Sequence, residues 1–253
     1  MRDLSRKWTD DQLKLAFYLY CQLPFGKLHS KNQIIIKMAS FLGRTPSALA
    51  MKLVNFASLD PAIKSTGRKG LGNASLSDHK IWDLFHNNWI GLAEECETIL
   101  HDDKIILSEE DNDQINYLGE THDSIVKVRL GQNFFRKSVL ASYENICCMS
   151  DVCIPELLIA SHIIPWSINK ENRLNPSNGL CLSAIHDKAF DKGFLTVLPD
   201  YSINVSSKIS NYDNNSEQMK LLLNLNGKTI RFPSKFLPEK SFLEWHNKNI
   251  FIP

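Results

Sequence analysis

Three polar residues in the second half of the chain have the types and spacing of a hydrolytic site. His162 ends an apolar stretch, Asn178 follows it by 16 residues, and His186 follows Asn178 by 8. Imidazole titrates near neutral pH, so His162 suits a general base that deprotonates water. His186 suits a metal ligand, because imidazole nitrogen binds most divalent transition ions. Asn178 can hydrogen-bond the backbone and hold His162 in place. Such a set could hydrolyse a phosphodiester, which also needs a cation to stabilise the phosphoryl charge.

Two strands and a helix would have to bring these side chains together. Residues 156–161 (ELLIAS) and 178–183 (NGLCLS) predict short strands, and the AIHDKAFDKG segment that follows predicts a helix that stops at Gly193. The loop between the strands is long and polar enough to cross over a site. A ββα unit with His, Asn and His at its junctions would direct these polar groups into one cleft.

The residues around this unit predict an α+β domain from 124 to 253. In chain order, the other expected elements are a helix at 126–143, a hairpin from 194–198 to 202–206, a strand at 228–232 and a helix at 238–250 that begins at Pro238. Apolar side chains of the first helix would pack into the core, namely Phe134, Val139, Leu140 and Tyr143.

The segment at 160–193, ASHIIPW through NPSNGLCLSAIHDKAFDKG, resembles the HNH endonucleases, a family of ββα-metal nucleases, and in particular the restriction-endonuclease-like HNH proteins of bacteria. The first His of the family motif falls on His162, the Asn on Asn178 and the last His on His186. Residues 129–148 are also similar to the lead-in of that group. The resemblance implies metal-dependent cleavage of DNA to a 5′-phosphate and a 3′-hydroxyl, in restriction or phage defence.

The sequence departs from the family pattern around the metal. Many relatives carry Asp or His directly before the first His, where this chain has Ser161, a weak ligand. Others carry a further His one turn after the last His, where this chain has Phe190. We expect His186 to bind the ion, with Ser161 and Asp187 as further candidates. Water and phosphate oxygens would complete the shell of Mg²⁺ or Mn²⁺, while Zn²⁺, Ni²⁺ and Co²⁺ are alternatives.

The first 90 residues predict a helical domain that binds DNA. They carry 13 basic and 6 acidic side chains, a net charge of 13 − 6 = +7. Thr9 or Asp10, Asn32 and Pro46 mark the starts of three helices. A helix, a short turn at Gly43 and another helix give the outline of a helix-turn-helix. A plain helical bundle is the alternative interpretation.

Several basic residues are candidates to contact DNA. In the first domain they are Arg44 and Lys52 of the helix-turn-helix and Arg68 and Lys69 of a loop at 60–76; in the second they are Arg129 and Arg136 of the first helix and Lys170 and Arg173 of the crossing loop. Each of them alone could be a solvated charge. As a group they would give the positive field that a DNA-binding cleft needs.

An acidic block separates the two domains. Residues 91–123 carry 1 basic and 11 acidic side chains, a net charge of 1 − 11 = −10. We expect a linker there. The predicted chain is therefore α+β, with an all-α, helix-turn-helix-like domain at 1–90, an acidic linker at 91–123, and an α+β domain with the ββα-metal motif at 124–253.

Composition excludes some classes of protein. No apolar run approaches the roughly 18 residues of a membrane helix, and no apolar segment follows the basic residues of the N-terminus. Six Cys are expected to be reduced thiols or metal ligands in a cytoplasmic protein. We therefore predict an HNH endonuclease that acts on double-stranded DNA, and leave open whether it works as a homodimer. The alternatives are a DNA-binding module whose HNH unit is catalytically silent, and a metal-stabilised interaction protein.

Overall fold

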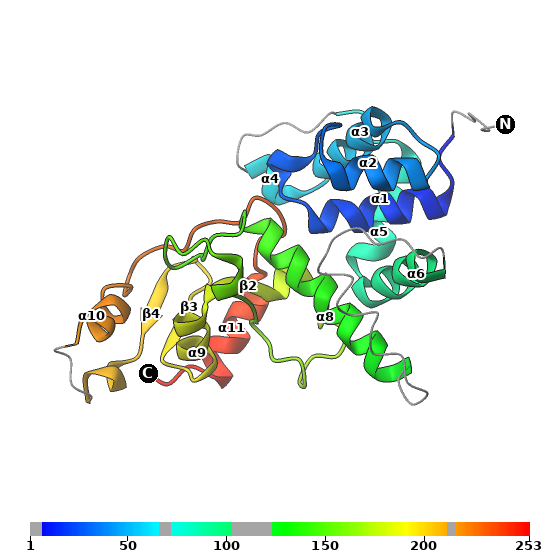
Figure 1. Ribbon diagram of the computed structural model, residues 1–253. Helices are drawn as coiled ribbons and strands as arrows, with labels where there is room; N and C mark the ends of the chain where they lie inside the picture. The colour runs from blue at the N-terminus through cyan, green and yellow to red at the C-terminus, as the bar shows by residue number, and fades with distance from the viewer. Residues whose placement is uncertain (1–6, 66–71, 103–122, 212–215) are drawn as a thin grey trace. The chain divides into compact units, whose positions relative to one another are not determined.

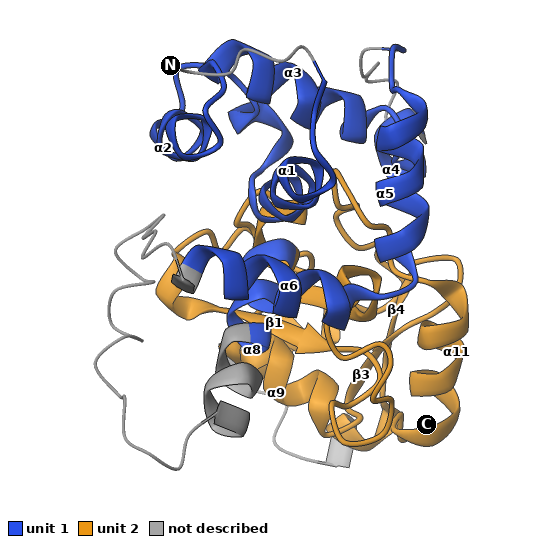
Figure 2. Ribbon diagram, turned by 90° about the vertical axis from the view of Figure 1, so that its right-hand side faces the viewer, with its two compact units in different colours: residues 1–138 blue, residues 139–253 orange. Residues whose placement is uncertain are grey.

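The computed structural model describes residues 7–65, 72–102, 123–211 and 216–253. The chain is α+β and divides into two compact units, residues 1–138 and 139–253 (Figures 1 and 2). The charge pattern predicts a domain boundary at 124, whereas this division falls within helix α8 (Asp123–Ser142). Among the described residues, no helix is long and apolar enough to cross a membrane.

The described residues of unit 1 fold largely into helices. These are α1 (Asp10–Gln22), α2 (Gln33–Phe41), α3 (Pro46–Ala57), α4 (Pro61–Ser65), α5 (Leu76–His86) and α6 (Trp89–Asp102) (Figure 1). The first part of the predicted acidic linker, residues 91–102, is therefore helical and belongs to α6. Its later part, with the EEDNDQ run at 109–114, lies outside the described residues.

The predicted helix starts are confirmed by their caps. Thr9 and Gln12 form a capping box at α1, and the Asn32 side chain accepts a hydrogen bond from the Ile34 N–H at α2. Pro46 occupies the first turn of α3. Gly43 has φ +65° in the turn between α2 and α3, a conformation that favours glycine.

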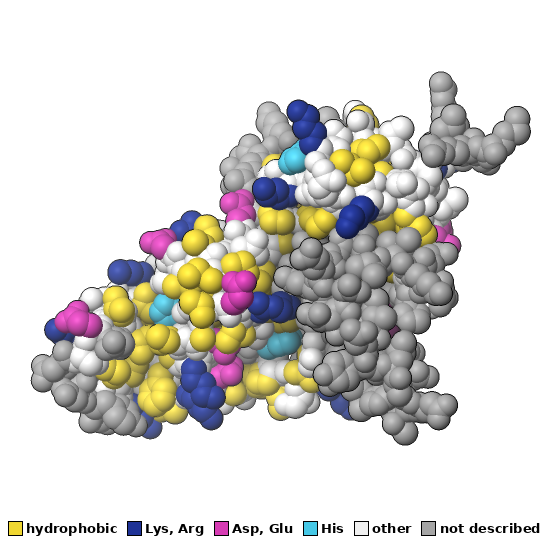
Figure 3. Space-filling view, viewed as in Figure 1, with side chains coloured by type: hydrophobic (Ala, Val, Ile, Leu, Met, Phe, Trp, Pro, Cys, Tyr) yellow, Lys and Arg dark blue, Asp and Glu magenta, His cyan; other side chains and the backbone are white. Residues whose placement is uncertain are grey.

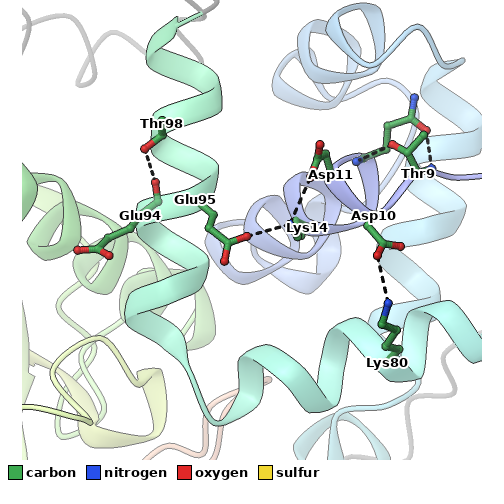
Figure 4. Close-up of polar contacts among 9 residues, drawn as sticks. Thr9, Asp10, Asp11, Lys14, Lys80, Glu94, Glu95 and Thr98 are labelled. Carbon is green, nitrogen blue, oxygen red and sulfur yellow. Dashed lines mark hydrogen bonds and ion pairs between the residues drawn. The ribbon is translucent and has the colours of Figure 1, made fainter.

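Ion pairs and aromatic packing hold these helices together. Lys14 of α1 lies 2.8 Å from a carboxylate oxygen of Glu95 on α6, and Lys80 of α5 lies 3.1 Å from Asp10 on α1 (Figure 4). In the core, the ring of Phe17 contacts those of Phe56, Trp82 and Trp89, with centroids 5.1, 5.5 and 5.9 Å apart. Such aromatic contacts add to the burial of apolar area.

Unit 2 contains the predicted ββα arrangement. Strand β1 (Leu158–His162) pairs with β2 (Gly179–Ser183) in antiparallel register, with His162 opposite Gly179. Helix α9 (Ala184–Asp191) follows β2 directly and packs against both strands. A second two-stranded sheet, of β3 (Leu195–Val197) and β4 (Ile203–Val205), is the predicted hairpin.

The end of unit 2 differs in part from the prediction. The predicted strand at 228–232 is reduced to one isolated bridge, between Ser202 and Thr229, because the Arg231 N–H turns away to the carbonyl of Cys148. Helix α10 (Glu217–Leu223) was not predicted. The last helix, α11, runs from Lys240 to Asn249 and so begins after Pro238.

Helix α11 supports the back of α9. The ring of His246 stacks on that of Phe190 with centroids 3.7 Å apart, and its Nδ1 lies 2.8 Å from Oγ1 of Thr196 on β3. Gly193 ends α9 with φ +72°, and its carbonyl accepts a hydrogen bond from the N–H of Ile252. These contacts fix the helix that carries His186.

Candidate active site

His162 lies at the end of β1 with one ring nitrogen already engaged. Its Nε2 lies 2.8 Å from the carbonyl oxygen of Arg173, in the loop between the strands. A carbonyl oxygen only accepts hydrogen bonds, so Nε2 carries the hydrogen of the neutral ring. Nδ1 is then the basic nitrogen. The edge of the Trp166 ring meets the His162 ring, with centroids 5.7 Å apart.

Burial keeps His162 neutral. The side chain is half-buried, and this desolvation lowers its pKa below the ordinary value, while the hydrogen bond to the Arg173 carbonyl acts in the opposite direction. A neutral imidazole is the form that accepts a proton. His162 therefore has the protonation state of a general base at neutral pH.

Asn178 ties the loop to the start of β2. Its side chain is fully buried. Its Oδ1 accepts a hydrogen bond from the Ile164 N–H at 2.8 Å, and its Nδ2 donates to the carbonyls of Ile164 and Asn172 at 3.1 and 3.2 Å. These bonds fix the backbone directly after His162. Two further asparagines extend the network, since Nδ2 of Asn175 donates to Oδ1 of Asn172.

His186 is buried in the first turn of α9 and makes its contacts through Nδ1. That nitrogen lies 3.0 Å from Oγ of Ser183 and 3.4 Å from Sγ of Cys147. A metal ion would therefore bind through Nε2. In metal sites, a partner on the other ring nitrogen orients the imidazole.

Cys147 was not predicted to belong to the site. Its sulfur accepts hydrogen bonds from the backbone N–H groups of Ser183 and Met149, at 3.2 and 3.5 Å, besides its contact with His186. Burial by itself raises the pKa of Cys147, but these hydrogen bonds, above all the one with His186, outweigh it and lower the pKa to about 7. No sequence signal near the motif histidines points to this residue, which lies 39 positions before His186.

The decisive comparison concerns this part of unit 2. Residues 147–198 match the family model of the HNH endonucleases. We call these residues the HNH segment. It begins at Cys147 and includes β1, β2 and α9 with all three motif residues, and it includes no residue of unit 1. The match confirms the family resemblance of the ββα unit. No curated protein matches the chain.

The candidate metal ligands of the HNH segment are His186, Ser161 and Asp187. In the parts of the chain that the structure describes, no three or more His, Cys, Asp and Glu side chains come together as a metal site. Cys147, Cys148 and Cys153, which lie close together in sequence before β1 and are all described, form no such group either. The Ser161 hydroxyl is buried without a hydrogen-bond partner, and Asp187 is half-buried next to His186. Such a set fits an ion that keeps water and phosphate oxygens, as Mg²⁺ does, better than a closed zinc site.

Asp187 also affects a neighbouring carboxyl group. Burial and the nearby Asp187 carboxylate raise the pKa of Asp191, one turn further along α9. Lys188 and Lys192 act in the opposite direction on Asp191, so acidic and basic groups alternate at this end of the helix.

Two of the predicted DNA contacts in unit 1 are engaged within the protein. Lys52 is buried, and its Nζ lies 2.8 and 3.0 Å from the two carboxylate oxygens of Asp78. Arg44 donates to Oε1 of Gln12 and lies over the Trp8 ring, 4.9 Å from its centroid. The charge of Lys52 is therefore neutralised inside the helical core, and Lys52 is not among the DNA contacts that we propose below.

The other candidates differ in exposure. Lys170 is exposed in the loop, whereas Arg136 of α8 and Arg173 are half-buried. Arg68, Lys69 and the side chain of Arg129 lie outside the described residues. On the face shown in Figure 3, the Lys and Arg side chains that the structure describes lie singly or in small groups among apolar ones.

Proposed function

We propose that this chain is a metal-dependent HNH endonuclease that hydrolyses DNA to 5′-phosphate and 3′-hydroxyl ends. The observation that supports it best is the bond from Nε2 of His162 to the Arg173 carbonyl, inside a segment that matches the HNH family. This bond leaves Nδ1 as the nitrogen that takes a proton from the attacking water. Burial keeps the ring neutral for that task.

The remaining site residues have supporting roles in this proposal. His186 would hold a divalent ion through Nε2, with Ser161 and Asp187 as further ligands. When bound, the ion would stabilise negative charge on the phosphoryl and leaving oxygens. Asn178 holds the loop through its three side-chain hydrogen bonds and so keeps the Arg173 carbonyl near His162.

Duplex DNA is the proposed substrate. Helices α2 and α3 have the helix-turn-helix outline, and we propose that an all-α domain at 1–90 positions the DNA, followed by an acidic linker at 91–123 and a nuclease domain at 124–253. Arg44, Arg68, Lys69, Arg129, Arg136 and Lys170 are the proposed phosphate contacts. We further propose a cytoplasmic role in restriction or phage defence, with a homodimer if both strands are cut at one site.

A plasmid-nicking assay tests the activity. The parent protein is expected to cut with Mg²⁺ or Mn²⁺ and to stop with EDTA. His162→Ala is expected to lower the cleavage rate by a factor of about 10² to 10⁴ while DNA binding stays nearly intact. His79→Ala, at an exposed histidine of α5 outside the HNH segment, is the matched control and should cut like the parent. Equal loss of binding and cleavage in His162→Ala would contradict the role of His162.

A catalytically silent HNH unit is the second candidate. It is favoured by Ser161, a weak ligand at the position before His162, and by the few ligands around His186. It predicts retention on a DNA column but no nicking with Mg²⁺, Mn²⁺, Ni²⁺ or Co²⁺. Cleavage of modified phage DNA would instead identify an enzyme that needs a modified target.

A further inference from the structure

We propose that Arg173 is a positioning residue whose side chain, clamped on Trp166, holds its own backbone carbonyl against His162. The inference rests on the proposed role of His162 as general base. It gives Arg173 a task other than the phosphate contact that the sequence suggests.

Three residues close a ring of contacts. Nε2 of His162 donates to the Arg173 carbonyl at 2.8 Å, and Nε of Arg173 donates to the Trp166 carbonyl at 2.7 Å. The guanidinium of Arg173 lies over the Trp166 ring, 5.1 Å from its centroid, and that ring in turn meets His162 edge-on. Each residue thus contacts the other two.

Trp166 is itself fixed to the loop. It lies in a turn in which the N–H groups of Ile168 and Asn169 both donate to the Pro165 carbonyl. At the other end, Asn178 holds the carbonyls of Ile164 and Asn172. The Arg173 side chain therefore connects two anchored stretches, one next to His162 and one next to Asn178.

The chemistry of the clamp requires arginine rather than any cation. A guanidinium is planar and carries an Nε–H beside its charge, so it can stack on a ring and donate sideways at once. Lysine carries the same charge but cannot make both contacts. If only the charge mattered, Lys170 in the same loop would contribute as much as Arg173, and it is the more exposed of the two.

Loss of the contacts between the Arg173 side chain and Trp166 would change which ring nitrogen of His162 carries the hydrogen. Without the side chain, the Arg173 carbonyl is held only from the side of Asn172, through Asn178, and its hydrogen bond with Nε2–H of His162 is weakened. The neutral ring then exchanges between tautomers, and in the Nδ1–H form Nδ1 cannot accept a proton from water. We expect turnover to fall while the affinity for DNA stays nearly the same.

The direct test is long-range ¹H–¹⁵N NMR of His162, at a pH where the ring is neutral and without DNA or metal. The parent is expected to show the Nε2–H tautomer alone. Arg173→Ala and Arg173→Lys should show a mixture, and Lys170→Ala should resemble the parent. Trp166→Leu, which removes the ring but keeps the carbonyl, tests the same clamp from its other side if Arg173→Ala does not fold.

Cleavage kinetics supply the second readout. Arg173→Ala and Arg173→Lys should lower kcat by about tenfold or more with little change in KM. Lys170→Ala should change mainly KM and its salt dependence. Full turnover in Arg173→Lys, or an unchanged His162 tautomer in both Arg173 variants, would overturn the inference. A parent that cuts no DNA would contradict the proposed function, while the NMR result would still decide whether the clamp exists.

Discussion

Sγ of Cys147 lies 3.4 Å from Nδ1 of His186, although the two residues are 39 positions apart. The same nitrogen lies 3.0 Å from Oγ of Ser183. The sulfur and this hydroxyl thus surround Nδ1 of His186 with polar atoms, and Nε2 is the nitrogen that would hold an ion in the proposed site. Partners of this kind orient metal-binding histidines and raise their basicity.

Replacement of Cys147 is therefore expected to weaken metal binding. Cys147→Ala should reduce the affinity for Mn²⁺ by roughly tenfold, whereas Cys147→Ser keeps a polar atom there and should lose less. Titration calorimetry without DNA measures this. Cys148→Ala is the control, because Cys148 is the buried neighbour of Cys147 in the sequence and its replacement leaves the contact between Cys147 and His186 in place. Equal losses in Cys147→Ala and Cys148→Ala would point to general damage of the fold.

His246 should make the protein sensitive to acid. Burial is the main cause that lowers its pKa to about 4, from an ordinary value of 6.5, so the ring is neutral in the folded protein. The unfolded chain binds a proton first, and the stability that this residue contributes is full above pH 6.5 and falls as the pH drops toward 4. We expect the lowered pKa of His246 to account for a loss of about 2 kcal/mol in the free energy of unfolding between pH 7 and pH 5.

His246→Phe keeps an aromatic ring against Phe190 but cannot take up a proton. Urea unfolding at pH 7 and pH 5 should show a smaller loss of stability in this variant than in the parent. His162, whose pKa is also lowered, contributes in the same direction in both proteins. The same loss in parent and variant would exclude His246 as a source of the effect.

Alanine should lower the stability of the protein by different amounts at two glycines that have a positive φ. Gly193 and Gly227 have φ +72° and +75°. A Cβ at Gly193 would collide with the carbonyl of Ile250, whereas one at Gly227 would meet nothing within 4 Å. Gly227→Ala should cost about 1 kcal/mol from backbone strain, and Gly193→Ala distinctly more. Chemical denaturation of the two variants would measure the difference, and similar costs would mean that the backbone around Ile250 gives way.

The buried ion pair between Lys52 and Asp78 in unit 1 indicates a structural role for Lys52. Lys52→Met leaves the Asp78 carboxylate buried without its counter-ion, and breaking such a pair costs about 3 to 5 kcal/mol. Lys80→Met is the matched control, because the Lys80–Asp10 pair is exposed and should be worth less than about 1 kcal/mol. Thermal unfolding would compare them. A Lys52→Met protein that keeps its stability but loses DNA affinity would instead support the original assignment of Lys52 to DNA contact.

Much of the fold could be predicted from local signals in the sequence. Thr9, Asn32 and Pro46 begin their helices because capping depends only on the next few residues. The ββα unit was also predictable, since its strands and helix are short and adjacent along the chain. Helix α10 was missed although it has a local start signal at Ser216, whereas the wrongly predicted strand depends on partners far away in sequence. The segment at 228–232 has the composition of a strand, but its N–H groups bond to different parts of unit 2.

The same limit applies to the site. His162, Asn178 and His186 could be identified from spacing and family resemblance, although their catalytic roles stay predictions. Cys147 could not, because nothing local connects it with α9. Lys52 illustrates a second limit: this basic residue of a predicted DNA-reading helix is paired with Asp78, 26 positions away, and its contact with DNA stays a prediction. Charge in a sequence indicates a field but does not say which groups remain in solvent.

The antiparallel register of β1 and β2 also determines where this chain can change length in evolution. His162 lies opposite Gly179, and strand side chains alternate between faces, so a deletion of one residue within β1 would exchange the faces of Ser161 and His162. In the exposed part of the crossing loop, around Lys170, side chains do not alternate between two faces of a sheet, so a change of length there does not move them to the other face. Extra residues there lengthen a closed loop at a small entropic cost, which grows only with the logarithm of its length. Insertions and deletions among relatives should therefore gather around Lys170, between the turn at Trp166 and the carbonyl of Arg173, and be rare within the two strands.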